Sequence, residues 1–240
     1  MDKTHAFLNP ARKLIDEVVD WLCGGAGYPG RIRRGADGVH SLAHILLVVP
    51  TAQSGRNVRL ALARRAQEKG WGGILPPLVR MPDLLLQPAG ARVATEAEEL
   101  AVYAELLRQI DLHAFPALFP NVPEERTLDW ALDTARTILG IYPILGEKGL
   151  LMREVACPED AARWKDLAAL EERFLAAFSA RGVLPRCRAR REAAEAGCVE
   201  PDIEEIVLPS AVDVSGVFTD YLAHSDCAVT LLLHAAPEEA

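Results

Sequence analysis

The sequence feature that most constrains the fold is a short apolar run, Ile45 to Val49, followed by a polar segment and a helix-like stretch. The run "ILLVV" is continuous and rich in β-branched residues, which indicates a strand covered on both faces, as in a parallel sheet. Beyond "PTAQS" the spacing predicts a helix from about Gly55 to Lys69, ended by Gly70. A strand, a polar loop and a helix in this order are the context of a phosphate-binding loop.

The rest of the chain divides into α/β parts on either side of a helical one. A helix is predicted over residues 11 to 23 and a second strand within residues 72 to 86. From Thr95 to Leu184 the pattern is helical, and Thr95 with Glu98 forms a capping box. Helices are expected there after residue 95, over about 124 to 142, over 158 to 182 and over 185 to 197. Strands are then predicted in residues 203 to 209 and 227 to 235, with a helix between them.

We therefore expect an α/β fold, a P-loop NTPase-like parallel sheet flanked by helices, with an all-helical insertion subdomain. Residues 1–94 form the first part of the core, residues 95–200 the insertion, and residues 201–240 the return to the core. The sequence ends just after a strand, where a parallel sheet would continue. It is therefore expected to be an N-terminal part of a larger protein.

Composition limits the classes of function. The formal net charge of -8 argues against a surface devoted to a nucleic-acid backbone, so any such role must be local. The N-terminal segment does not resemble a secretory signal peptide, and no apolar run approaches the ~20 residues that cross a bilayer. The five cysteines are scattered without a CxxC pair, which indicates neither a disulfide framework nor a structural zinc site. A cytoplasmic protein without a membrane partner is expected.

The candidate nucleotide site is the segment Pro50 to Asn57, "PTAQSGRN". Laid on the pattern G-x-x-x-x-G-K-[ST], it keeps only Gly55, with Pro50 in place of the first glycine, Arg56 in place of lysine and Asn57 in place of the hydroxyl residue. Arginine keeps the charge but is planar and bulkier than lysine. The candidate nucleotide-binding residues are Ser54, Gly55, Arg56 and Asn57, although one matching glycine leaves coincidence open.

Two other motifs have plainer interpretations. "GAGYPG", with Gly25, Gly27 and Gly30, spells the dinucleotide fingerprint but follows a helix and precedes a strand, the reverse of the required order, so we interpret it as a connection. His40 and His44 lie four residues apart without a glutamate between them, so they are interpreted as polar residues at a strand start.

Two arginine clusters could contact phosphates. In an acidic chain, however, such runs more often form a solvated face paired with the chain's own carboxylates. The clusters are Arg31, Arg33 and Arg34, and Arg186, Arg188, Arg190 and Arg191.

Four stretches, in this order, resemble the N-terminal helicase-like region of AddB and RexB type subunits of bacterial helicase-nucleases, relatives of UvrD-like superfamily 1 helicases. They are "HILLVVPTAQSGRNVRLALARR", "ILPPLVRMPDLLL", "WKDLAALEERFLAAFSARGVLPRCRARREA" and "IEEIVLPSAVDVSGVFTDYLAHSDCAVTLLLHA". The resemblance covers about residues 40 to 236. It depends on the order of the four stretches and on their general residue pattern more than on invariant residues.

The resemblance explains the altered loop. Active helicases of this kind read A-G-S-G-K-T, which falls on Ala52 to Asn57, so the lysine and the threonine are both replaced. The acid of the Walker B strand falls on Pro209, followed by Ser210. Phosphoryl transfer depends on charges placed around the γ-phosphate, and the resemblance implies that these standard parts are missing.

The implied function is that of a catalytically inactive helicase-like domain in a DNA double-strand-break repair helicase-nuclease. Its expected partners are an AddA/RexA-like helicase subunit or a downstream nuclease domain of the same protein, and single-stranded DNA, in which the corresponding region helps to recognise a Chi-like sequence. No nuclease motif or iron–sulfur cysteine spacing occurs in this chain. No cofactor is required. The alternatives are a regulatory domain that binds ATP without hydrolysis and a pure protein-interaction scaffold.

Overall fold

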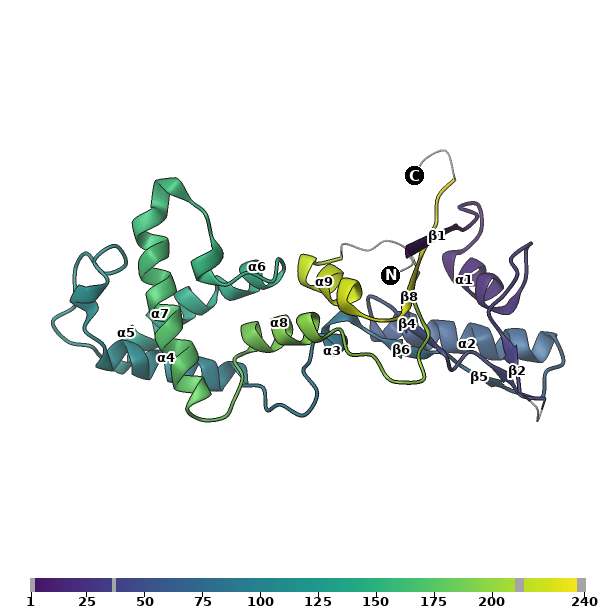
Figure 1. Ribbon diagram of the computed structural model, residues 1–240, viewed down its shortest axis with the longest axis horizontal. Coiled ribbons are helices and arrows are strands. Elements are labelled where there is room, and N and C mark those ends of the chain that lie inside the picture. The colour runs from purple at the N-terminus through teal and green to yellow at the C-terminus, as the bar shows by residue number, and fades with distance from the viewer. Residues whose placement is uncertain (1–2, 36–37, 210–213, 237–240) are drawn as a thin grey trace. The chain divides into compact units, whose positions relative to one another are not determined.

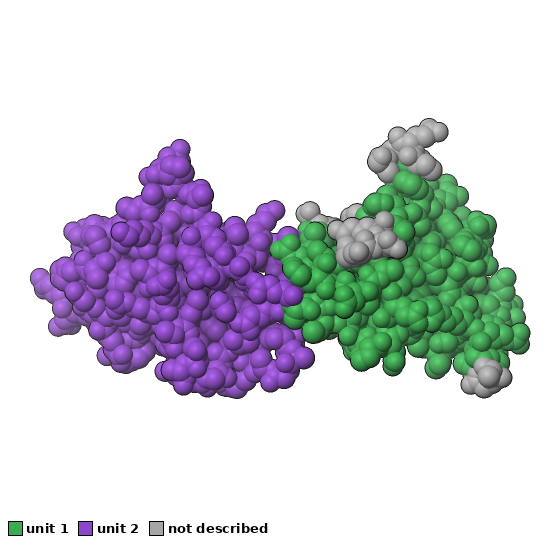
Figure 2. Space-filling model, in the orientation of Figure 1, with its two compact units in different colours: residues 1–85, 196–214, 218–240 green, residues 86–195, 215–217 purple. Residues whose placement is uncertain are grey.

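The computed structural model describes residues 3–35, 38–209 and 214–236. The chain forms two compact units, which Figure 2 shows in different colours. The α/β unit comprises residues 1–85, 196–214 and 218–240, and the helical unit comprises residues 86–195 and 215–217. The sequence predicts the helical part at residues 95–200, whereas the helical unit begins at residue 86 and its main segment ends at residue 195. None of the helices in the described ranges is long and apolar enough to span a membrane.

The α/β unit contains a five-stranded sheet in which every pair of neighbours is parallel. The strands are β1 (Lys3–Phe7), β4 (Ile45–Val48), β6 (Leu78–Arg80), β7 (Glu205–Pro209) and β8 (Ala228–Leu233), in the order β1-β8-β7-β4-β6. The predicted fold class, an α/β parallel sheet flanked by helices with an all-helical insertion, is confirmed.

The edge strand β1 was not predicted. Its five residues, "KTHAF", are too polar and too few to signal a strand by themselves. They form one by pairing with β8, with Lys3 beside Val229 and Phe7 beside Leu233.

Helices α1 (Leu14–Cys23) and α2 (Ala52–Glu68) lie against each other over one face of this sheet (Figure 1). Their core includes Ile45 and Leu47 of β4 and the next residue beyond the strand, Val49, together with Val207 of β7 and Leu232 of β8. The alternate residues Leu46 and Val48 are buried as well. The central strand is therefore covered on both faces, which is the environment that a continuous apolar run predicts.

The connections leave the centre of the sheet in opposite directions. From β4 the chain passes through α2 to β6 on one side, and from β7 it passes through α9 (Gly216–His224) to β8 on the other. The strand order therefore reverses between β4 and β7. Ligands of open α/β sheets bind outside the carboxyl ends of the strands at such a switch point. Here those ends are Val48 and Pro209, followed in β4 by the start of α2.

A small second sheet lies in the same unit, with the order β2-β3-β5. Its strands are β2 (Arg33–Arg34), β3 (His40–Ser41) and β5 (Ile74–Leu75). The "GAGYPG" loop connects α1 to β2, and Gly30 approaches Gly24 so closely that an added Cβ would lie 2.8 Å from the Gly24 Cα. This glycine therefore serves chain packing, in agreement with its interpretation as a connection.

The helical unit contains α4 (Glu96–Gln109), α5 (Leu128–Leu139), α6 (Tyr142–Gly146), α7 (Ala161–Ser179) and α8 (Arg186–Ala196), after the short α3 (Pro82–Leu85) of the α/β unit. The capping box of Thr95 and Glu98 is confirmed at the start of α4. Helix α5 begins at Leu128, later than predicted, because the Thr127 side chain caps it by accepting from the Trp130 amide. Tyr103, Phe174 and Phe178 are central in the core of this unit.

Candidate functional site

The junction of β4 and α2 contains no open phosphate loop. Three residues, Val49 to Thr51, join the strand to a helix that begins at Ala52. The predicted start at about Gly55 is therefore wrong, because Thr51 is the N-cap: its Oγ1 accepts from the Ser54 amide at 3.1 Å. The Gly55 amide donates to the Thr51 carbonyl at 3.2 Å. Two amides that a phosphate loop would turn toward its ligand are thus used inside the helix.

Gly55 has a packing role. It is buried against the sheet, and an added Cβ would lie 2.9 Å from Cγ1 of Val79 on β6, closer than a Cβ approaches any atom in ordinary structures. In a phosphate loop a glycine allows the backbone to approach the ligand. Here the same residue type allows the helix to approach a neighbouring strand.

The other candidate nucleotide-binding residues do not converge on one point. Ser54 is half-buried and its Oγ lies 2.9 Å from Thr51 Oγ1, within the helix cap. Arg56 and Asn57 are exposed, and Asn57 accepts a hydrogen bond of 2.9 Å from Gln53. With Gly55 turned toward the sheet, the four residues predicted to bind nucleotide face different directions.

The Walker B position also lacks an acid where the structure describes it. Pro209 is buried at the end of β7, and since Leu47 pairs with Val207, it stands level with Val49 at the carboxyl edge. Ser210 lies outside the described residues. Among the residues that the structure describes, no group of three or more His, Cys, Asp or Glu side chains is arranged to hold a metal ion.

The two arginine clusters are largely paired with carboxylates. In the first, Arg31 bonds Glu205 at 3.2 Å and Arg33 makes a two-pronged contact with Glu204, whose pKa is lowered by these hydrogen bonds. Arg34 is exposed, and no side-chain partner is found for it within the described ranges.

The second cluster follows the same pattern. Arg186 bonds Glu99 at 2.7 Å, Arg188 bonds Glu192 at 3.1 Å, and Arg191 bonds Glu154 at 2.8 Å. These residues therefore support the interpretation of a solvated face paired with its own acids.

A different set of arginines is unpaired. Arg56, Arg59 and Arg64 are exposed on the outer face of α2, and within the described part of the chain none of their side chains has an ion-pair or hydrogen-bond partner. At 100° per residue they fall within about 140° of one another around the helix axis. Leu60, 53% exposed, lies between them. We call these four residues the basic face of α2.

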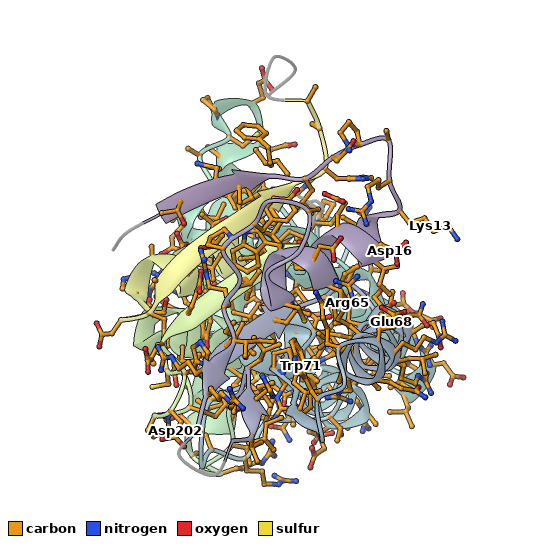
Figure 3. All side chains as sticks on the ribbon, turned by 90° about the vertical axis from the view of Figure 1, so that its right-hand side faces the viewer. Lys13, Asp16, Arg65, Glu68, Trp71 and Asp202 are labelled. Carbon is orange, nitrogen blue, oxygen red and sulfur yellow. The ribbon has the colours of Figure 1, made fainter. Side chains whose placement is uncertain are left out.

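The next residue, Arg65, marks the edge of this face. It turns toward α1, where it pairs with Asp20, and its Nε lies 3.3 Å from Glu68; Figure 3 labels Arg65 and Glu68 on α2. Burial of Asp20 opposes its ionisation, but the hydrogen bonds from Arg65 and Arg12 outweigh burial and keep the pKa of this carboxyl below its usual value. The inward face of α2 is thus neutralised by α1, while its outward face stays positively charged.

Sequence reasoning identified Arg56 for a different reason and missed Arg59 and Arg64. The available signal was that Arg59 follows Arg56 by three residues and Arg64 follows Arg59 by five on a predicted helix. This spacing does not tell whether a carboxylate from elsewhere in the fold neutralises the arginines. No protein-family model and no curated protein sequence matches this chain. The fold defines its class: an α/β protein with a parallel sheet, an all-helical insertion and an unpaired basic face on the helix that follows β4.

Proposed function

We propose that this chain is a non-catalytic helicase-like module of an AddB-type subunit of a DNA double-strand-break repair helicase-nuclease, and that it holds the backbone of single-stranded DNA on the basic face of α2. The observation that supports DNA contact is the set of unpaired arginines on one helix face of an acidic protein. Arginine is the residue best suited to phosphate contacts, because its planar fork donates several hydrogen bonds at once.

The geometry of the face suits a polyanion. With a rise of about 1.5 Å per residue, Arg56 and Arg64 lie about 12 Å apart along the helix axis. For a strand stacked at the ~3.4 Å spacing of duplex DNA, this length spans about three to four phosphates. The first turn of α2 contains no acidic residue, so its amide dipoles add to the positive potential of the same helix. Leu60 offers an apolar contact to a sugar or a base.

The same geometry disfavours the alternative of a domain that binds ATP without hydrolysing it. The Ser54 and Gly55 amides are already bonded to Thr51, and Gly55 faces Val79. A ligand that binds only the folded state at 100 times its Kd stabilises that state by about 2.7 kcal/mol. We expect no such thermal shift with millimolar ATP and magnesium. A thermal shift would favour that alternative, and ATP turnover that Arg56→Ala abolishes would overturn the non-catalytic assignment.

The proposal includes the surroundings of the module. Its partners are an AddA/RexA-like helicase subunit or a nuclease domain of the same protein, and its place is the cytoplasm.

Fluorescence anisotropy with a labelled oligothymidine at low salt tests the proposal. The wild-type chain should bind, and a variant with Arg56, Arg59 and Arg64 all changed to Gln should not. Arg34→Gln removes one exposed, unpaired charge elsewhere in the α/β unit and is the matched control. If the triple variant binds as well as the wild type, the basic face of α2 is not the DNA site. If the wild type binds no DNA at all, the scaffold alternative takes its place.

A further inference from the structure

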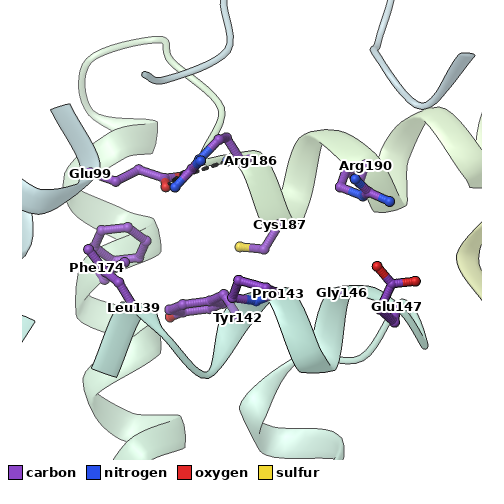
Figure 4. A pocket seen from close by; sticks show the side chains of 10 residues that line it. All are labelled: Glu99, Leu139, Tyr142, Pro143, Gly146, Glu147, Phe174, Arg186, Cys187 and Arg190. Atoms are coloured by element: carbon purple, nitrogen blue, oxygen red, sulfur yellow. Dashed lines mark hydrogen bonds and ion pairs between the residues drawn. The ribbon is translucent and has the colours of Figure 1, made fainter. Parts of the chain in front are cut away.

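A cavity of about 250 Å³ lies within the helical unit and plays no part in the proposed DNA contact. Figure 4 shows it between α6 and α8, with Tyr142 and Pro143 on one side and Arg186 and Cys187 on the other. Phe174 closes one end, and Glu147 and Arg190 face each other at the opposite end. Every residue that lines the cavity belongs to the helical unit.

The cavity is an opening at the side of an aromatic cluster. Phe174 packs against Tyr103 with ring centroids 4.6 Å apart, against Phe178 at 5.0 Å and against Tyr142 at 6.0 Å. Only Phe174 and Tyr142 of these four rings border the cavity. An aromatic guest would extend this cluster, because aromatic rings prefer stacked or tilted contacts at such separations.

The polar part of the lining suits an aromatic ring as well. The side chains of Arg186 and Arg190 border the cavity from α8, and guanidinium groups are attracted to the faces of aromatic rings. The Tyr142 hydroxyl is buried next to the Tyr103 hydroxyl and Glu171, so it is the ring of Tyr142 that borders the cavity.

The charged groups around the cavity balance one another, two carboxylates against two guanidinium groups, which favours an uncharged guest. Glu99, also part of the lining, accepts from both the amide and the Nε of Arg186, at 2.6 and 2.7 Å, and so neutralises that guanidinium. Glu147 places a second carboxylate at the rim. Burial raises the pKa of the Cys187 thiol to about 12, so that it stays uncharged.

The size limits the guest to a small molecule. An apolar protein cavity of about 150 Å³ holds benzene, so a volume of about 250 Å³ accommodates two fused rings. We propose that this cavity is a binding site for a flat, uncharged, two-ring aromatic compound of the size of indole.

A titration of the full chain with indole, followed by two-dimensional amide NMR, tests this inference. Saturable chemical-shift changes are expected at the amides of Gly146, Cys187 and Arg190, with a Kd for indole below about 1 mM. Indole-3-acetate, which has the same rings and a carboxylate, should bind at least about tenfold more weakly. Scattered shifts that do not saturate, or equal binding of the two compounds, would overturn the proposal.

Gly146→Leu provides the matched variant. Gly146 is one of the lining residues, and an added Cβ there meets no atom within 4 Å, so the position accepts a larger side chain without a clash at its Cβ. It should weaken indole binding by about tenfold or more. Gly73→Leu, at another position where a Cβ meets open space, is the control and should leave binding unchanged. Cys187→Leu fills the cavity from the opposite wall; unchanged indole binding in both filled variants would also refute the site.

Discussion

The salt dependence of DNA binding is the sharpest test of the basic face of α2. Each phosphate that a protein neutralises on single-stranded nucleic acid contributes about -0.7 to the slope of log K against log salt. Arg56, Arg59 and Arg64 together should contribute a slope of about -2.1, which corresponds to a roughly 18-fold loss of affinity between about 50 and 200 mM salt. Each single Arg→Gln change should reduce the slope by about 0.7.

The measurement is anisotropy of a labelled oligothymidine over a series of sodium chloride concentrations, with Arg34→Gln as the control. The substitutions are on an exposed surface and keep a good helix former, so stability should stay within about 0.5 kcal/mol of the wild type. A loss of affinity will then report a lost contact rather than unfolding. The reasoning fails if the triple variant keeps the wild-type slope, or if Arg34→Gln changes the slope as much as each α2 variant does.

Three further predictions concern stability. Gly55→Val should lower the free energy of unfolding by about 1–3 kcal/mol in a urea titration, because its Cβ meets Val79 at 2.9 Å; a neutral result would contradict the close packing of α2 on β6. Thr51→Ala should cost about 1 kcal/mol by removing the N-cap of α2, whereas Thr51→Ser should cost much less. Because the pKa of Asp20 is lowered in the folded state, its contribution is fully present above the unfolded aspartate pKa of about 3.9 and is lost as the pH falls through the lowered value. Asp20→Asn should therefore flatten the acid limb of the stability curve, and an unchanged limb would show that the ion pair with Arg65 does not contribute.

At the candidate nucleotide site, the sequence motif predicts a phosphate loop, whereas the backbone forms the capped start of a helix. The order strand, short segment, helix was correctly predicted around residue 50. What the pattern could not show is that Thr51 caps the helix, which therefore begins at Ala52, three residues before the predicted start. A threonine between a proline and an alanine is compatible with a loop or a cap, and only the backbone path selects the cap.

The sequence by itself determined the class of fold. The continuous apolar run at Ile45, the helical spacing from Thr95 onward and the return of apolar strands after residue 203 are local patterns. Local patterns are readable because secondary-structure periodicity and capping depend on neighbours in the chain.

The tertiary structure alone decided the strand order, the edge strand β1 and the electrostatic state of each arginine. Strand β1 exists through contacts with residues more than 220 positions away. Arg31 and Arg65 are neutralised by acids from distant segments, whereas the outer face of α2 meets none among the described residues. Whether a charge is paired depends on which segments the fold brings beside it, and a motif in one segment contains no information about the other.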